Sequence, residues 1–459
     1  MSAIQSLGIS ELAGVATYAE AARIGFSVDE NVRRLVRFHW IERRLMIMAV
    51  AHLPATPEWE VKCALALHQW LDVGHADALR QRITEMRNPV PRLDVVPDAA
   101  LEVFLEELAR AEDTVELLAG LYAVAHPALT AAYRAHIERT NPLVDHPTVR
   151  VLKQALTDED EMMAWGERAL GALLRDSSAR SRADAWIAHL GAYLDAAGGI
   201  AGDAPSRSSP LPSRRTRAPV VPDMHPRRDA RFHGQYNFHF PPHQVYTMPE
   251  VPADERNLAL LCKRTLEMDV PEMMASFIIE RADQPWQFYL DYSRQLWDEA
   301  RHAMMGSVAF EARGVDWSQI PLNVSFGLRL NLHATPLERQ TMLYGIEQSL
   351  MPSETGKRSE KETAESSGDA LSGHFHDYDW ADEVLHAQIG RRWAREEGIG
   401  PAEAIERAKA IHERTWAELD RYRDRDPQSA WWNDFVRQVL GHDSAVDETA
   451  LGEVKALRE

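Results

Sequence analysis

Two short segments of the chain each carry a glutamate followed three residues later by a histidine. They are WDEARHA at residues 297–303 and ADEVLHA at residues 381–387. Both lie in sequence that favours helix, and residues three apart on a helix lie on the same face. A glutamate and a histidine placed in this way can reach one metal ion together. The spacing therefore predicts that Glu299, His302, Glu383 and His386 are metal ligands.

Two further glutamates, Glu272 and Glu347, lie in helical stretches and are predicted to complete a site for two ions. Four carboxylates buried together repel one another, and each buried charge carries a desolvation cost of several kcal/mol. Two divalent cations cancel four carboxylates, while two imidazoles add neutral donors. Oxygen-rich ligation with one histidine per metal suits iron or manganese better than zinc.

The choice of Glu272 depends on spacing. This residue follows Pro271, which either kinks a helix or begins a new one, so Glu267 and Glu280 are alternatives. Glu272 precedes Glu299 by 27 residues, close to the 30 residues between Glu42 and Asp72 in the first half. That agreement favours Glu272.

Paired Glu-x-x-His motifs with single glutamates from two more helices resemble the dinuclear site of the ferritin-like superfamily, which includes di-iron oxidases and oxygenases. The resemblance covers roughly residues 253–395, and a weaker copy covers roughly 28–190. It implies two iron ions, or manganese or a mixed pair, held by Glu272, Glu299, His302, Glu347, Glu383 and His386. It does not transfer a substrate, because this fold serves many reactions.

Most of the chain has apolar residues at three- and four-residue spacing, which predicts an all-α fold. The two halves also match each other at three places in the same order. The matched segments are 70–76 with 297–303, 121–125 with 343–347, and 158–166 with 382–390. Similar spacing between these segments indicates an internal duplication, with two four-helix bundles in tandem and a C-terminal helical extension.

The first half keeps fewer of the ligands. Its candidates are Glu42, Asp72, His75 and Glu159. Ala125 stands in place of Glu347, and Met162 stands in place of His386. Alanine cannot ligate, and methionine is a poor ligand for hard divalent ions. We therefore expect a structural role for the first bundle, with one bound ion as the alternative.

Four parts are predicted along the chain. A degenerate ferritin-like bundle spans 1–197, a linker rich in Pro, Arg and Ser spans 198–252, the metal-binding bundle spans 253–400, and the helical extension spans 401–459. The basic part of the linker, 207–231, is expected to lie across acidic helices of its own chain. A second polar segment, 352–377, is expected to be a solvated insertion, with a lid over the site as the alternative.

Composition limits the partners and the compartment. The chain has 51 Lys and Arg against 70 Asp and Glu, a formal net charge of −19, which argues against binding nucleic acid or anionic membranes. Its two cysteines exclude a disulfide framework. We find no secretory signal, and the longest apolar run, near 45–50, is too short to cross a membrane. We expect a cytoplasmic protein.

The leading hypothesis is a non-haem, di-iron, O2-dependent oxidase or oxygenase that acts on a small organic substrate. An electron-donor protein and a homodimer are left open. Asp298 and Asp382 are interpreted either as partners that orient the histidine rings or as surface charges, and Arg301 is expected to face solvent. The alternative hypothesis is a metal-stabilised scaffold or interaction protein without turnover, in which the ions only neutralise buried carboxylates.

Overall fold

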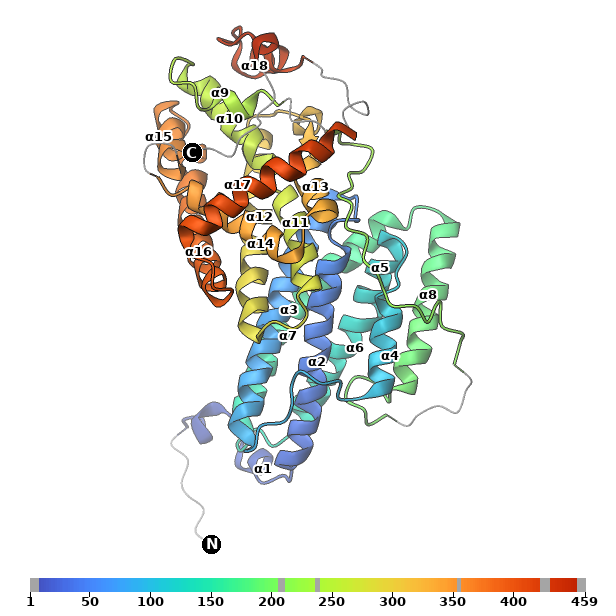
Figure 1. Cartoon of the computed structure of the whole chain (residues 1–459). Helices are drawn as coiled ribbons and strands as arrows, with labels where there is room; N and C mark the ends of the chain where they lie inside the picture. The colour runs from blue at the N-terminus through green and yellow to red at the C-terminus, as the bar shows by residue number, and fades with distance from the viewer. Residues whose placement is uncertain (1–7, 205–210, 236–239, 353–355, 422–429, 452–459) are drawn as a thin grey trace. The chain divides into compact units, whose positions relative to one another are not determined.

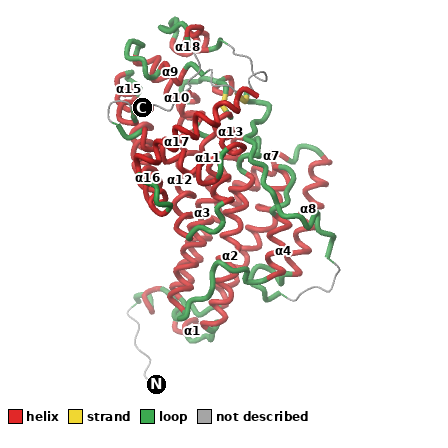
Figure 2. Tube along the Cα trace, viewed as in Figure 1, coloured by secondary structure: helices red, strands yellow, loops and turns green. Residues whose placement is uncertain are grey.

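The computed structural model describes residues 8–204, 211–235, 240–352, 356–421 and 430–451. Helices are the main regular secondary structure of these residues, joined by loops, and the all-α prediction is confirmed (Figure 2). One pair of parallel two-residue strands, β1 (Gly234–Gln235) and β2 (Leu322–Asn323), is the exception in the described part. The chain divides into two compact units: residues 1–48 with 71–221 form the first unit, and residues 49–70 with 222–459 form the second.

Five long helices and several shorter ones build the first unit (Figure 1). In chain order they are η1 (Leu12–Gly14), α1 (Tyr18–Ala21), most of α2 (Val28–His52), the later part of α3 (Trp59–Met86), α4 (Ala99–Leu108), α5 (Thr114–Gly120), a π-helical turn η2 (Leu121–Ala125), α6 (His126–Arg139), α7 (His146–Leu173) and α8 (Ser177–Ala196). Helices α2, α3 and α7 carry the polar residues singled out in the first half.

The second unit is also helical (Figure 1). Its helices from residue 242 onward are α9 (Pro242–Val245), α10 (Ala253–Leu266), α11 (Asp269–Glu280), α12 (Trp286–Glu311), η3 (Trp317–Gln319), α13 (Ser325–His333), α14 (Pro336–Ser349), α15 (Lys357–Ser366), α16 (Ala370–Glu396), α17 (Pro401–Trp416), η4 (Ala417–Arg421), α18 (Trp432–Leu440) and η6 (Glu448–Ala450). Helix α17 packs along α14, and α15 packs against α10 and α16.

Side-chain caps begin several of these helices. Thr335 and Glu338 form a capping box at the start of α14, where Pro336 takes the first helical position. Asp369 accepts a hydrogen bond from the Ser372 N–H at the start of α16. Such caps satisfy backbone N–H groups that have no partner within the helix. They fix where α14 and α16 begin, and these two helices carry three of the predicted ligands.

The division into units differs from the predicted boundaries. The predicted linker, 198–252, is split near residue 221, and residues 49–70 belong to the second unit. The expectation for its basic part is confirmed where the structure describes it. Arg215 pairs with Glu116 at 2.6 Å, and Arg231 pairs with Glu60 at 2.7 Å. The arginines of the linker thus lie on acidic helices within their own units.

The segment 352–377 is not the solvated loop that we predicted. Its described residues form α15 and the start of α16. Helix α15 is amphipathic, and Lys357, Glu360, Thr363 and Ala364 on one side of it are buried. The prediction failed because polar composition was taken as a sign of solvation, whereas here the buried polar groups are paired with charges on other helices.

Equivalent glycines in the two halves have the same packing role. Gly166 on α7 faces the ring of Tyr122, and a Cβ built on it would lie 2.2 Å from that ring. Gly390 on α16 faces the ring of Tyr344, where the corresponding distance is 2.4 Å. The sequence alignment pairs these two glycines and these two tyrosines. The shared close approach of helix and ring supports the internal duplication.

We expect Gly166→Ala to lower the free energy of unfolding of the first unit by about 1–3 kcal/mol, because the added methyl group must displace the Tyr122 ring. Gly171, on the same helix, has no atom within 4 Å of a built Cβ. Gly171→Ala is therefore expected to stabilise by up to about 1 kcal/mol through helix propensity. Urea unfolding followed by circular dichroism measures the free energy of unfolding of both variants. An equal change of this free energy in the two variants would contradict the packing argument.

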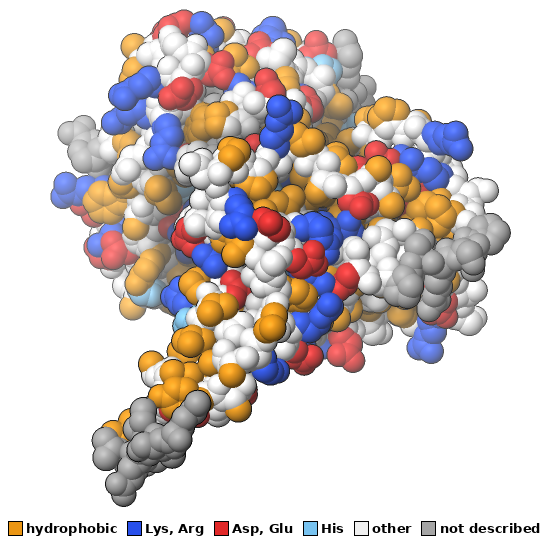
Figure 3. Space-filling model, turned by 90° about the horizontal axis from the view of Figure 1, so that it is seen from below, with side chains coloured by type: hydrophobic (Ala, Val, Ile, Leu, Met, Phe, Trp, Pro, Cys, Tyr) orange, Lys and Arg blue, Asp and Glu red, His pale blue; other side chains and the backbone are white. Residues whose placement is uncertain are grey.

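One described helical stretch, Thr114–Arg139, is long and apolar enough to cross a membrane by length and composition, and 67% of its most apolar window is buried. The core helix of a globular unit meets the same criterion. On the surface, side chains of both signs lie next to one another over the face shown in Figure 3. Exposed pairs of opposite charge occur among the described residues, such as Arg134 with Asp160 at 2.7 Å.

Candidate metal centre

Three helices of the second unit bring five of the six predicted ligands together. Glu299 and His302 lie on α12, Glu347 lies on α14, and Glu383 and His386 lie on α16. In α12 and α16 the glutamate precedes the histidine by three residues, so both side chains leave one face of the helix. All five are buried, with 3% or less of each residue exposed.

One group of donors consists of Glu299, Glu347, Glu383 and His386, whose ligand atoms all lie within 4.8 Å of one another. Nδ1 of His386 is 3.2 Å from Glu299 Oε1 and 3.3 Å from Glu383 Oε2. Gln295 donates a hydrogen bond of 2.9 Å to Glu347. Three carboxylates and one imidazole can therefore surround a single ion.

The carboxylates of this group do not share one charge state. Burial and the charge of Glu383 raise the pKa of Glu347 well above its ordinary value. Burial acts in the same direction on Glu383, but Lys357 and hydrogen bonds with Glu347 and His386 hold the pKa of Glu383 well below its ordinary value. These shifts favour the neutral form of Glu347 and the ionised form of Glu383. A metal ion bound here would release protons.

A second group of donors consists of Glu267, Glu299 and His302. Nδ1 of His302 lies 3.6 Å from Glu299, 3.7 Å from Glu267 and 3.3 Å from Asp379. Glu299 belongs to both groups, as a carboxylate that bridges two ion positions would. Glu267, at the C-terminal end of α10, occupies the place in which Glu272 was expected.

In both imidazoles the outer nitrogen, Nε2, which lies away from the glutamate carboxylates, faces the aspartate of the other Glu-x-x-His segment. Nε2 of His302 is 3.1 Å from Asp382, and Nε2 of His386 is 3.4 Å from Asp298. These contacts confirm the interpretation of both aspartates as partners of the rings, and they leave each Nδ1 facing the carboxylates. Arg301, which we expected to face solvent, is partly exposed and also pairs with both aspartates.

A lysine lies among the carboxylates. Nζ of Lys357, at the start of α15, is 2.7 Å from Glu383, 2.8 Å from Asp379 and 3.9 Å from Glu267. The Lys357 side chain is fully buried. Its ammonium group therefore places a fixed positive charge beside both donor groups, nearest to Glu383 of the first. Sequence reasoning missed this residue because it lies in the segment interpreted as solvated.

Arg264 adds a second fixed charge. Its guanidinium pairs with Asp379, with Glu267 at 2.8 Å and with Glu360 at 3.1 Å. Arg264 and Lys357 outweigh the effect of burial and hold the pKa of Asp379 well below its ordinary value. Asp379 is thus an anion between two cations of the chain, and one side of the centre is neutralised without a metal.

Glu272 lies apart from this centre. Its carboxylate is 2.6 Å from Lys62 Nζ and accepts two hydrogen bonds from Arg228, all three side chains being 5% exposed or less. Helix α10 ends before Glu267, and α11 begins at Asp269, so the two glutamates belong to different helices. Spacing carried a weak signal for Glu267, which precedes Glu299 by 32 residues, against 30 between Glu42 and Asp72.

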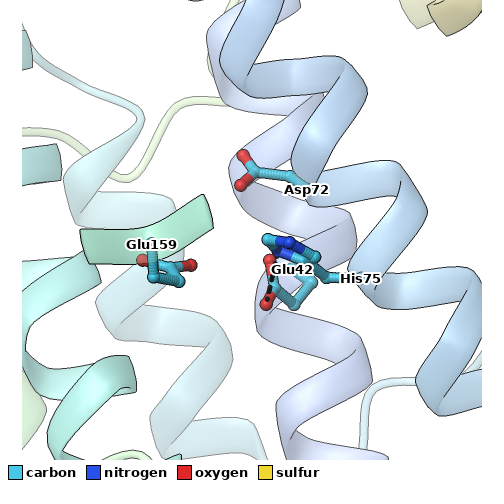
Figure 4. Close-up of side chains that lie close together, drawn as sticks. All are labelled: Glu42, Asp72, His75 and Glu159. Atoms are coloured by element: carbon cyan, nitrogen blue, oxygen red, sulfur yellow. Dashed lines mark ion pairs between the residues drawn. The ribbon is translucent and has the colours of Figure 1, made fainter. Parts of the chain in front are cut away.

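The first unit contains its own cluster, Glu42, Asp72, His75 and Glu159, whose donor atoms also lie within 4.8 Å of one another. They come from α2, α3 and α7 (Figure 4). Nδ1 of His75 is 3.4 Å from Glu42, and its Nε2 is 3.0 Å from Asp158. Asp158 therefore contacts the outer nitrogen of His75 in the way that Asp382 contacts that of His302.

Two residues that sequence reasoning missed complete this cluster. His126 Nδ1 lies 3.0 Å from Glu159, and the Tyr133 hydroxyl donates a hydrogen bond of 2.5 Å to Glu42. Burial favours the neutral ring, but Glu159 and the other carboxylates raise the pKa of His126 to about 9. The π-helical turn η2 directly precedes His126. Its extra residue per turn brings the ring to Glu159, one position beyond Ala125.

Both donor sets fit divalent ions of the iron or manganese type, since carboxylates predominate and sulfur is absent. In the second unit, Glu347 Oε2 and His302 Nδ1 are buried and have no hydrogen-bond partner among the described residues. Buried polar atoms of this kind are otherwise rare, and a ligand is one way to satisfy them.

Comparison of the chain with protein-family models, with curated proteins and with solved structures gave no match. The class of the protein is therefore defined here by its all-α fold and by two buried carboxylate–histidine clusters.

Proposed function

We propose that the second unit is a ferritin-like, non-haem metal centre of an O2-dependent oxidase or oxygenase that acts on a small organic substrate. The observation that carries the proposal is the convergence of Glu299, Glu347, Glu383 and His386 within 4.8 Å. Glutamates and histidines from separate helices that meet inside a helical bundle are typical of di-iron and di-manganese carboxylate proteins.

The proposed cofactor is iron, in a pair of ions or mixed with manganese. Bound to these residues, such ions supply redox chemistry with O2, and the protein supplies geometry and a dry environment. We propose that a donor protein supplies the reducing electrons and that the protein acts in the cytoplasm.

The two ion positions are unequal because of Lys357 and Arg264. The position among Glu299, Glu347, Glu383 and His386 has one such cation in contact among the described residues, Lys357, which lies 2.7 Å from Glu383. In the other position, among Glu267, Glu299 and His302, Glu267 contacts two cations, Arg264 at 2.8 Å and Lys357 at 3.9 Å. We therefore propose that the first of these positions binds its ion tightly and that the second binds its ion weakly.

The neighbouring residues of the chain are proposed to set the ring geometry. Asp298 and Asp382 accept hydrogen bonds from the outer nitrogens of the two histidines, which fixes the tautomer that presents Nδ1 to a metal. Arg301, which is partly exposed, forms an ion pair with each of the two aspartates. These contacts pre-organise the donors before any ion enters.

A second function, a metal-stabilised scaffold without turnover, is favoured by one observation. The cluster is fully buried, and Lys357 and Arg264 already neutralise part of it. In that case the ion would serve folding stability alone, and the chain would consume no O2.

Metal analysis and O2 consumption of the full chain, purified after iron supplementation and supplied with a chemical reductant, test the proposal. Glu299→Ala and His386→Ala are expected to remove at least one ion per chain and to abolish O2 consumption. Glu311 on α12 and His374 on α16 are exposed, so Glu311→Ala and His374→Ala serve as matched controls with unchanged metal. Full metal content and activity in either ligand variant would refute the proposal, and bound metal without O2 consumption would favour the scaffold.

A further inference from the structure

We propose that the first unit holds a separate site for one divalent cation, ligated by Glu42, Asp72, His75 and Glu159. This site is independent of the proposed oxidase centre, and it lies in the half of the chain that the sequence indicated to be degenerate. Its four donors come from three helices of one unit and point toward a common centre (Figure 4).

The first argument is that buried donor atoms in this cluster lack partners. Oδ1 of Asp72, Oε2 of Glu42 and Nδ1 of His75 are buried and make no hydrogen bond to any residue that the structure describes. Asp72 is 1% exposed, and Glu42 is fully buried. A buried carboxylate oxygen without a partner is strongly unfavourable, and a cation at the centre of the cluster satisfies all three atoms.

The second argument is that no lysine or arginine among the described residues pairs with these carboxylates. Among the described residues, the ion pairs of Glu42 and Glu159 are with His75 and His126, and none is with a lysine or an arginine. The second unit differs, because Lys357 and Arg264 contact its carboxylates. Three carboxylates and a divalent ion leave a net charge of −1, which the surrounding imidazoles can balance.

The third argument is that the ligands are held in place by further contacts. Asp158 binds the outer nitrogen of His75 and leaves Nδ1 facing Glu42. Tyr133 donates to Glu42, and His126 contacts Glu159. Partners of this kind orient metal ligands and raise metal affinity.

The donor set indicates the class of ion. Three carboxylates and one imidazole are hard or borderline donors, and they favour Mn(II) or Fe(II) over soft ions that need cysteine. Met162 stands in place of the second histidine of the other half, and its thioether is a poor ligand for these ions. The site is therefore expected to hold a single ion.

Titration of Mn(II) into the metal-free full chain, with free Mn(II) counted by electron paramagnetic resonance, tests the proposal. Asp72→Asn and Glu159→Gln are each expected to lose one bound Mn(II) per chain, or to bind it at least tenfold more weakly. Asp160→Asn is the matched control, because Asp160 is an exposed neighbour of Glu159 that pairs with Arg134. It is expected to keep the wild-type count.

The same experiment distinguishes the cation site of the first unit from the metal centre proposed for the second unit. Glu299→Ala in the second unit is expected to leave the Mn(II) of the first unit in place. Asp72→Asn keeps the shape of the side chain and breaks no hydrogen bond of the described residues, so circular dichroism should show a folded protein. A wild-type Mn(II) count in both first-unit variants would overturn this inference, and so would a complete loss of binding in Glu299→Ala. A failure of the oxidase proposal alone would change neither result.

Discussion

Replacing Lys357 with methionine is expected to lower the free energy of unfolding of the metal-free second unit by about 3–5 kcal/mol. Methionine keeps much of the length of the side chain but removes the charge. Glu383 and Asp379 then lose the ammonium that lies 2.7 and 2.8 Å away, and both remain buried. Urea unfolding in the presence of a chelator measures the loss.

The same variant is expected to bind metal better. With the ammonium gone, a divalent ion can neutralise Glu267, Glu299 and Glu383, and the chain should take up one more Mn(II) or Fe(II) than the wild type. An ion at 100 times its Kd restores about 2.7 kcal/mol. Lys361→Met is the control, because Lys361 lies one turn further along α15 and is partly exposed. Unchanged stability and unchanged metal content in Lys357→Met would contradict the role assigned to this lysine.

Replacing Glu272 with glutamine is expected to destabilise the second unit by about 3–5 kcal/mol and to leave its metal content unchanged. The carboxylate is the anion shared by Lys62 and Arg228, and its removal leaves two buried cations uncompensated. Burial already lowers the pKa of Lys62 to about 8, although Glu272 opposes this change. Thermal unfolding and elemental analysis of the same preparation measure the two effects.

A suitable control for Glu272→Gln lies on the same helix. The side chain of Glu280 is 40% exposed and pairs with Arg339, so Glu280→Gln is expected to change the free energy of unfolding by less than about 1 kcal/mol. If Glu272→Gln instead removes a metal ion and leaves the free energy of unfolding unchanged, Glu272 is a metal ligand, as the sequence predicted. Its ion pair with Lys62 then makes no contribution to stability.

One structural difference separates the clusters of the two halves. The cluster of the second unit has a lysine and an arginine among its carboxylates, whereas the described ion pairs of the first-unit cluster are with histidines. The number of ligands retained in each half is therefore an incomplete guide to where ions bind. A half with fewer ligands and no competing cation can be the better site for one ion.

The sequence by itself determined the helical class and the paired Glu-x-x-His motifs, and it offered Asp298 and Asp382 either as partners of the histidine rings or as surface charges. These features depend on spacing within one helix, where each residue advances the side-chain direction by a constant angle. The alignment of the halves also placed Tyr122 with Tyr344 and Gly166 with Gly390, and the structure packs both pairs alike.

Only the tertiary structure decided which glutamate lies beside His302. It alone also showed that Lys357 and His126 contact the carboxylates of the two clusters. Glu267 and Glu272 lie on either side of the break between α10 and α11, where helical periodicity no longer relates the directions of their side chains. Lys357 reaches Glu383 from a separate helix, and His126 reaches Glu159 after a π-helical turn. Contacts across helices depend on how the helices pack, because local spacing carries no information about distance between elements.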